Sequence, residues 1–165
     1  MSSSEPISIY QLSVNDLALM EELLTVFGEA FNEVDTYSSS RPSDAYLKKL
    51  LSSDYFIAIA ALKNGSVVAG LAAYELQKFE QERSEIYIYD LAVAVSHRRE
   101  GIATTLIREL KKIAVARAAY VIFVQADIGD DPAIALYTKL GVREDVLHFD
   151  IAIVDSAEVK IAYRQ

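Results

Sequence analysis

The chain has 165 residues, a formal net charge of −8 and a pI near 4.8, and 52% of its residues are hydrophobic. This length suits one domain that buries its own core, and the acidic balance disfavours nucleic acid as a partner. The absence of cysteine excludes disulfides, thiolate metal sites and a cysteine nucleophile. The two histidines, His97 and His148, are far apart in sequence, which argues against a histidine-based metal site.

The sequence carries no sign of a membrane segment or a secretion signal. No apolar run approaches the roughly 20 residues that span a bilayer. The first residues, MSSSEPIS, lack the basic and apolar regions of a signal peptide. We therefore expect a cytoplasmic protein that binds neither membranes nor nucleic acid.

The first half of the chain has the pattern of helices followed by an antiparallel hairpin. Periodicity predicts a strand over 7–12, a helix over 17–31, a polar loop over 32–44, a helix over 46–51 and strands over 56–62 and 66–76. Asn64-Gly65 between the last two strands is a strong hairpin signal. The loop carries Glu33, Asp35 and Tyr37, for which simple solvation competes with a role in binding.

The second half alternates strands and helices. The pattern predicts a strand over 85–93, a helix over 102–117, a buried strand over 119–127, a helix over 132–140 and closing strands over 146–154 and 159–163. Asp131 is the expected cap of the helix that starts at Pro132. Two strand–helix–strand passages after an antiparallel front half predict an α/β fold, with a mixed twisted sheet and helices on both faces in one domain over 1–165.

The junction after the strand over 85–93 has the chemistry of a phosphate site. His97-Arg98-Arg99 forms a basic turn, and Gly101 directly precedes the next helix. A helix N-terminus presents backbone N–H groups and partial positive charge to an anion, and glycine lets a phosphate approach the backbone. Neither a P-loop nor a Rossmann fingerprint is present. The competing interpretation is that the arginines are solvated and Gly101 only begins a helix.

Two motifs resemble those of the GNAT superfamily of N-acetyltransferases. Arg98-x-x-Gly101-x-Ala103 after a strand is similar to its coenzyme A pyrophosphate motif, and the segment 130–142 is similar to its later motif. The later motif matches at Asp130, Ala133, Leu136, Tyr137 and Gly141, and it departs at Asp130, where many members have asparagine. The runs SEIYIYDLAV, HRR-x-GIAT, VQAD-x-GDDPA, LYTKLG and HFDI resemble the aminoglycoside 3-N-acetyltransferases of this superfamily.

This resemblance implies a GNAT fold, acetyl-CoA as co-substrate without a metal, a homodimer, and resistance to aminoglycoside antibiotics as the biological outcome. It implies that Tyr137 protonates the departing thiolate, although Tyr137 could instead only pack on its helix. It also implies a bulge near Leu91 to Val93 that frees backbone N–H groups. The residues expected at the cofactor are Leu91, Ala92, Val93, Arg98, Arg99, Glu100, Gly101, Ile102, Ala103, Thr104 and Tyr137.

A cationic substrate suits the carboxylates of the chain. Asp90 interrupts an apolar strand, where an unpaired charge is costly, and we expect it to take a proton from the attacking amine, directly or through water. The residues expected at the substrate are Asp35, Tyr89, Asp90, Asp127, Asp130 and Asp150. Three alternatives stay open: an enzyme for another cationic amine such as a polyamine or a protein N-terminus, a non-catalytic acyl-CoA sensor, and a nucleotide-binding module.

Overall fold

The computed structural model describes residues 6–153. The chain divides into two compact units, residues 1–127 and 128–165, and each is described here by itself. Among residues 6–153, no helix has the length and apolar character that crossing a membrane requires.

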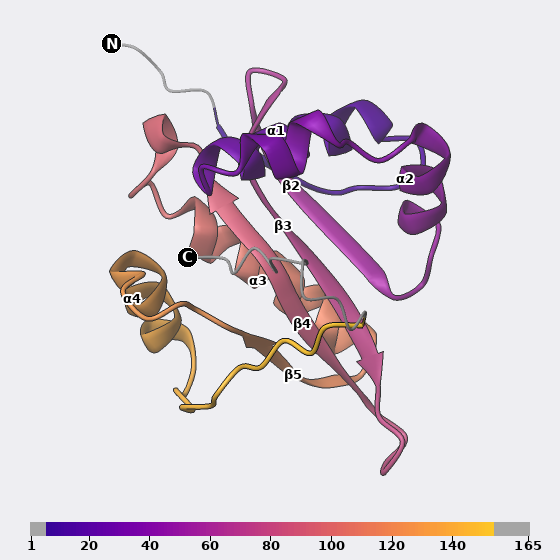
Figure 1. The fold of residues 1–165 in the computed structure, drawn as a ribbon, viewed down its shortest axis with the longest axis vertical. Helices are drawn as coiled ribbons and strands as arrows, with labels where there is room; N and C mark the ends of the chain where they lie inside the picture. The colour runs from indigo at the N-terminus through magenta and orange to yellow at the C-terminus, as the bar shows by residue number, and fades with distance from the viewer. Residues whose placement is uncertain (1–5, 154–165) are drawn as a thin grey trace. The chain divides into compact units, whose positions relative to one another are not determined.

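The first unit is built on a five-stranded mixed sheet (Figure 1). In spatial order its strands are β1 (Ser8–Gln11), β2 (Phe56–Lys63), β3 (Ser66–Gln77), β4 (Ser84–Val93) and β5 (Ala119–Val124). The first four pair antiparallel and β5 pairs parallel to β4. The parallel pair follows from the helix between β4 and β5, because a crossover returns the chain in the same direction.

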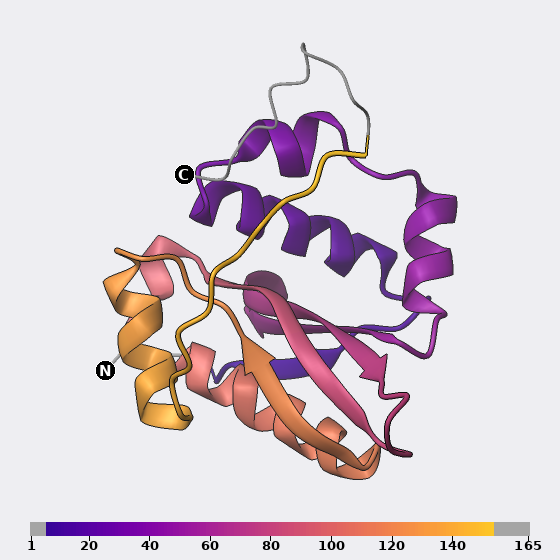
Figure 2. The same ribbon diagram turned by 60° about the horizontal axis from the view of Figure 1, so that its bottom comes forward.

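Helices cover both faces of this sheet, as the sequence predicted (Figure 2). α1 (Leu17–Ala30) and α2 (Asp44–Leu51) lie on one face, and α3 (Ile102–Ala116) lies on the other. The face under α1 includes the small residues Ala58, Ala60, Gly70, Ala72 and Ala92 beside larger ones such as Phe56 and Val67. The face under α3 carries the branched residues Ile57, Ile59, Leu71, Ile86 and Ile88, all of them buried. The missing side chain at Gly70 lets Leu23 of α1 approach the backbone of β3 closely.

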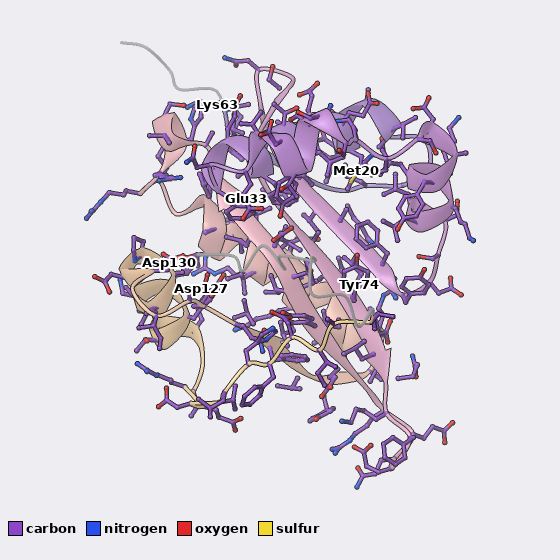
Figure 3. The ribbon with its side chains drawn as sticks, in the orientation of Figure 1. Met20, Glu33, Lys63, Tyr74, Asp127 and Asp130 are labelled. Carbon is purple, nitrogen blue, oxygen red and sulfur yellow. The ribbon has the colours of Figure 1, made fainter. Side chains whose placement is uncertain are left out.

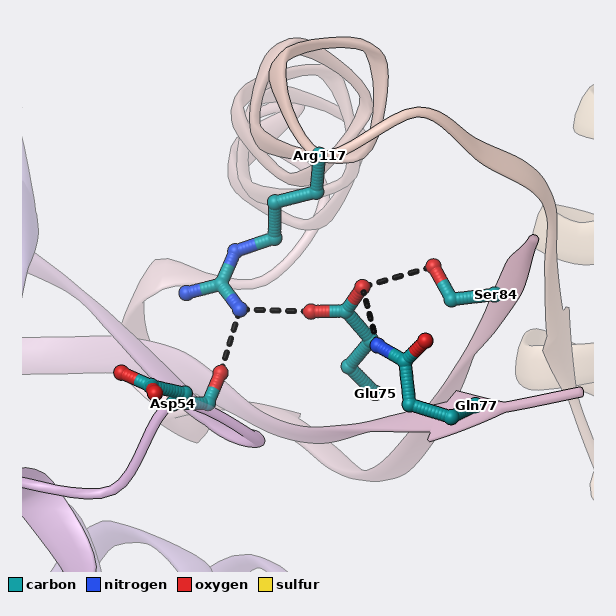
Figure 4. Close-up of polar contacts among 5 residues, drawn as sticks. All are labelled: Asp54, Glu75, Gln77, Ser84 and Arg117. Carbon is teal, nitrogen blue, oxygen red and sulfur yellow. Dashed lines mark hydrogen bonds and ion pairs between the residues drawn. The ribbon is translucent and has the colours of Figure 1, made fainter. Parts of the chain in front are cut away.

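A buried carboxylate joins the end of α3 to the sheet (Figure 4). Arg117 caps α3, and its Nη1 lies 2.6 Å from Oε2 of Glu75, whose side chain is only 8% exposed. The same guanidinium donates to the backbone carbonyl of Asp54, and the Ser84 hydroxyl donates to Glu75 Oε1 at 2.6 Å. Because an unpaired buried carboxylate costs several kcal/mol, these contacts hold β3, β4 and the end of α3 in one arrangement.

The second unit contains α4 (Asp131–Leu140). Its N-cap is Asp130, whose Oδ1 accepts from the Ala133 N–H at 3.2 Å, and Pro132 lies in its first turn. The expectation that Asp131 is the cap is therefore wrong by one residue. Asp131 is the first helical residue, where its charge complements the helix dipole.

Two predicted strands differ from the structure. β5 ends at Val124 and not at Asp127, and it is not fully buried, since Tyr120 is 48% exposed. Residues 146–153 form no strand, although their apolar residues alternate. Alternation describes a strand only where a neighbour supplies a hydrogen-bonded ladder, and Phe149 and Ile151 are largely exposed. Residue 154 and the second predicted closing strand, 159–163, lie outside the described residues.

The close approach of α1 to β3 predicts the effect of adding one methyl group. A Cβ on Gly70 would lie 2.4 Å from Leu23 Cδ1 and 2.6 Å from the Ile59 carbonyl oxygen. Gly70→Ala should therefore destabilise the fold by about 1–3 kcal/mol through overpacking. Gly141→Ala is the control, because its nearest new contact is 3.8 Å. Thermal melts of both variants check this, and equal melting temperatures would contradict the tight α1–β3 contact.

Candidate active site

A β-bulge decides where Asp90 points. Ala73 of β3 pairs with Ile88 and Ala72 pairs with Asp90, so Tyr89 is an extra residue in β4. Strict alternation from the buried Ile88 would turn Asp90 toward α3. The extra residue instead puts Asp90 on the face of Ala72, under α1. The bulge expected near Leu91 to Val93 is therefore at Tyr89, and Leu91 to Val93 pair regularly with β3.

The partly buried Asp90 accepts a hydrogen bond from a residue far away in sequence. The Tyr37 hydroxyl donates to Asp90 Oδ2 at 2.9 Å. Tyr37 is buried and belongs to a π-helical turn, η1 (Asp35–Ser39), in the segment that the sequence pattern indicated as a solvated loop. The sequence left both solvation and a role in binding open for Tyr37, and its burial and its contact with Asp90 exclude simple solvation.

β4 and β5 part in the middle of β4. Their pairing ends at Ile88 and Val124, while β4 continues for five more residues, 89–93. The Ala94 N–H donates to Val68 of β3 at 2.8 Å. Since successive residues of a strand direct their N–H groups to opposite sides, Leu91 and Val93 direct theirs toward the edge that β5 has left. An extended ligand could pair with this edge as a strand would.

The predicted phosphate turn follows directly. After the short 3₁₀-helix η2 (Val95–His97), Arg99 and Gly101 have positive φ angles of 65° and 78° and bring the chain into α3. The first turn of α3 contains no acidic residue. Its first N–H groups, at residues 102–104, have no acceptor within the helix, so they are suited to an anion. The guanidinium of Arg98 donates to the Val93 carbonyl at 3.1 Å, which fixes the turn against the end of β4.

The residues expected at the cofactor in the first unit are thus brought into one continuous segment, from the open edge of β4 to the first turn of α3. Glu100 is the acidic member of this segment. Its carboxylate oxygens lie 3.9 Å from Lys63 Nζ and 3.9 Å from His97 Nδ1. The Lys63 ammonium therefore offsets the charge of Glu100 beside the turn.

An open groove of about 640 Å³ lies on the first unit and is lined mostly by tyrosines. The lining residues, here called the tyrosine groove, are Tyr55, Tyr74, Tyr87 and Tyr89 with Glu75, Leu76 and Gln77. Tyr74, which is labelled in Figure 3, meets Tyr89 edge to face with ring centroids 5.8 Å apart and stacks with Tyr55 at 6.4 Å. Burial raises the pKa of Tyr74, and its neighbours Tyr46, Tyr89, Asp90 and Tyr55 raise it further. The phenol of Tyr74 therefore keeps its proton at neutral pH, and Tyr89 joins the groove to Asp90.

Two other predicted carboxylates of the first unit lie on exposed segments. Asp35 is exposed on the turn that carries Tyr37, and it accepts a hydrogen bond from the Ser39 hydroxyl at 3.2 Å. Asp127 is exposed three residues after β5 ends. Their contact with a substrate stays a prediction.

The remaining predicted site residues belong to the second unit. Burial and the charge of Asp130 raise the pKa of Tyr137 on α4 to about 12. Asp130 itself caps α4. His148 Nε2 lies 3.1 Å from Asp150 Oδ1, and both residues are exposed. The parts of Tyr137, Asp130 and Asp150 in a shared site stay predictions.

The described side chains include no group of three or more His, Asp or Glu residues that could hold a metal ion. The donors described above are backbone N–H groups, guanidinium groups, phenols and carboxylates. This set suits an organic ligand with phosphate groups.

The comparisons with known proteins agree with this arrangement. The acetyltransferase (GNAT) family model matches residues 18–142, across the boundary between the two units. A comparison with curated protein sequences gave no match.

Among solved structures, an aminoglycoside acetyltransferase from an uncultured soil metagenomic sample is 66% identical over 91% of this chain and 100% of its own, with a TM-score of 0.89. A second aminoglycoside acetyltransferase from such a sample, in complex with trehalose, is 32% identical over 90% and 97%, with a TM-score of 0.84. The same enzyme in complex with sisomicin aligns at 31% identity over 90% and 97%, with a TM-score of 0.83. This chain therefore belongs to the GNAT family of acetyltransferases.

Proposed function

We propose that this enzyme transfers the acetyl group of acetyl-CoA to an amino group of an aminoglycoside, the 3-amino group, by direct attack. The observation that carries the proposal is the bulge at Tyr89, which places the Asp90 carboxylate under α1 and next to a groove lined by tyrosines. The similarity to two aminoglycoside acetyltransferases, one of them solved with sisomicin, supports this substrate class.

The segment from β4 to α3 fits acetyl-CoA in its chemistry. The N–H groups of the first turn of α3, with Arg98 and Arg99, would hold the pyrophosphate, and Gly101 leaves the backbone uncovered there. Leu91 and Val93 would offer N–H groups to the extended arm and to the acetyl oxygen. Acetyl-CoA, when bound, supplies a thioester carbon that a neutral amine can attack.

A charge placed in the first turn of α3 tests this assignment without harming the helix. Thr104 is the third residue of α3, a position where glutamate stabilises helices. Thr104→Glu should keep or raise the melting temperature and weaken acetyl-CoA binding about 10-fold, because a carboxylate repels the pyrophosphate. Thr104→Gln has the same shape without the charge and is the control. Calorimetric titration measures both, and equal affinity in the two variants would remove this turn from the cofactor site.

On the substrate side, an aminoglycoside combines ammonium groups with ring faces. Phenol rings such as those of Tyr74 and Tyr89 can pack against such rings and attract cations through their faces. The net charge of −8 favours the approach of a polycation. Asp35, Asp127, Asp130 and Asp150 would add carboxylates around it.

The transfer removes two protons from the ammonium nitrogen and supplies one to the sulfur. Asp90 would take the first of these protons, directly or through water, and the freed nitrogen lone pair would form the new C–N bond while the C–S bond breaks. The second proton would leave the nitrogen to water as the amide forms. Tyr137 would return a proton to the sulfur. Its pKa of about 12 keeps the phenol protonated throughout the neutral range, as this role requires.

The role of Asp90 is tested by removing its charge and keeping its shape. Asp90→Asn should lower kcat for sisomicin by about 10²–10⁴-fold, the usual contribution of a general base. Acetyl-CoA affinity should hardly change, since Asp90 would face the amine. Steady-state kinetics across aminoglycosides and polyamines, with product regiochemistry by NMR, check the substrate class as well. Wild-type turnover in a folded Asp90→Asn enzyme would exclude Asp90 as the base.

Tyr137→Phe tests the acid. The variant should lose about 10²-fold in kcat while its affinity for sisomicin is unchanged, because only thiolate departure is slowed. Because of its raised pKa, the phenol loses its proton only near pH 12. Deprotonation of Tyr137 should therefore cause no fall in the wild-type rate below about pH 10. A pH–rate series on both proteins measures this. An undiminished kcat in Tyr137→Phe would leave the residue a packing role.

Two broader expectations belong to the same proposal. Resistance to aminoglycosides follows if the acetylated amine is one that the drug needs for its action. Growth of a susceptible strain in the presence of the drug, when the strain expresses this chain, would show the resistance. A homodimer in the cytoplasm stays our expectation, which light scattering and cell fractionation would check.

A further inference from the structure

We propose that Tyr37 is a positioning residue for the transfer reaction, whose hydroxyl fixes the Asp90 carboxylate in its orientation toward the substrate amine. This inference rests on the proposed function, because it assigns a task to the neighbour of the proposed base. The inference gives the segment between α1 and α2 a role in the chemistry, and this segment lies outside both family motifs described above.

The first support is the contact itself. The Tyr37 hydroxyl donates to Asp90 Oδ2 at 2.9 Å across a sequence separation of 53 residues. A hydrogen bond to an ionised carboxylate is roughly twice as strong as one between neutral groups. A side-chain carboxylate otherwise rotates easily about its last torsion, so one such bond is enough to select an orientation.

The second support is that the ring of Tyr37 is held on two sides. Its centroid lies 6.0 Å from that of Phe27 and 5.9 Å from that of Phe31, with both pairs tilted. Phe27 and Phe31 stack on each other at 5.9 Å. Only 8% of Tyr37 is exposed. The phenol therefore reaches Asp90 from a position against Phe27 of α1 and Phe31 at the C-cap of that helix.

The third support is the backbone below the ring. A Cβ on Gly28 would lie 3.0 Å from Tyr37 Cβ, so glycine in α1 lets the π-helical turn come this close. The Glu33 N–H donates to the Gly28 carbonyl at 2.8 Å, and the Tyr37 N–H donates to the Glu33 carbonyl at 3.1 Å. π-helical turns occur frequently at functional sites, and this one aims a hydroxyl at the proposed base.

Arg41 links the π-helical turn back to α1. Its Nε donates to the Tyr37 carbonyl at 3.4 Å, and its Nη2 donates to the Thr25 hydroxyl of α1 at 2.8 Å. Thus α1, through Thr25, Phe27 and Gly28, determines the position of Tyr37. A residue that only filled the core would not need its hydroxyl to meet a carboxylate, and this difference can be measured.

A double-mutant cycle separates a positioning role from a packing role. Tyr37→Phe keeps the ring and removes the donor, so kcat for sisomicin should fall about 10-fold or more while KM for acetyl-CoA is unchanged. In the Asp90→Asn background the same change should cost less than about twofold, because there is no longer a carboxylate to orient. Tyr10→Phe, on the exposed edge strand β1, is the matched control and should behave as wild type.

The possible outcomes distinguish this inference from the proposed function. The positioning role is overturned, and the function left intact, if the wild type is active and Tyr37→Phe does not lower kcat. The same holds if Tyr37→Phe lowers kcat by the same factor in the wild-type and Asp90→Asn backgrounds. A wild type that turns over neither sisomicin nor spermidine overturns both. Gly28→Ala is the second variant: it keeps the hydroxyl but pushes Tyr37, and it should lower kcat several-fold. Thermal melts on every variant show that the protein measured is folded.

Discussion

The single extra residue in β4 is the constraint on which the proposed site depends. Ile86 and Ile88 pack under α3, and Ala92 packs under α1, so the faces of this strand are fixed at both ends. Between them, Tyr89 shifts the alternation by one, and both Tyr89 and Asp90 leave the α3 face. Without this shift, Asp90 would share a face with two buried isoleucines, where an unpaired charge is costly. The bulge makes a charged residue compatible with a central strand and turns it toward the Tyr37 hydroxyl at the same time.

The packing of α1 makes the rest of the environment of Asp90 possible. Small residues on β2, β3 and β4 let this helix lie close to the sheet, and Gly70 marks the closest approach. The same helix carries Phe27 and Gly28, which hold Tyr37. The side-chain volumes of the core therefore determine how far the Tyr37 hydroxyl stands from Asp90. Stability and the geometry of the site are here consequences of one interface.

The sequence predicted most of the fold because its elements have clear periods and clear ends. The hairpin at Asn64, the helix after Gly101 and the helix–strand alternation were all confirmed. What it could not predict depends on pairing in three dimensions. The family resemblance implied a bulge near Leu91 to Val93, and its position at Tyr89 depends on pairing with β3, which the sequence does not show. The segment with Tyr37 has the composition of a loop. The alternation in 146–153 indicated a strand, yet no ladder forms there.

Two carboxylates on opposite faces of the β3–β4 pair show how environment separates structural from chemical roles. Glu75 meets Arg117, a full positive charge, and accepts hydrogen bonds from the Ser84 hydroxyl and the Gln77 side-chain amide, so its own charge is offset within the fold. The Tyr37 hydroxyl, a neutral phenol, donates a hydrogen bond to Asp90. A neutral donor orients a carboxylate and adds no opposing charge of its own. Because the Glu75 carboxylate is already paired with Arg117 inside the fold, our proposal assigns the proton transfer to Asp90, which lies beside the groove lined by tyrosines.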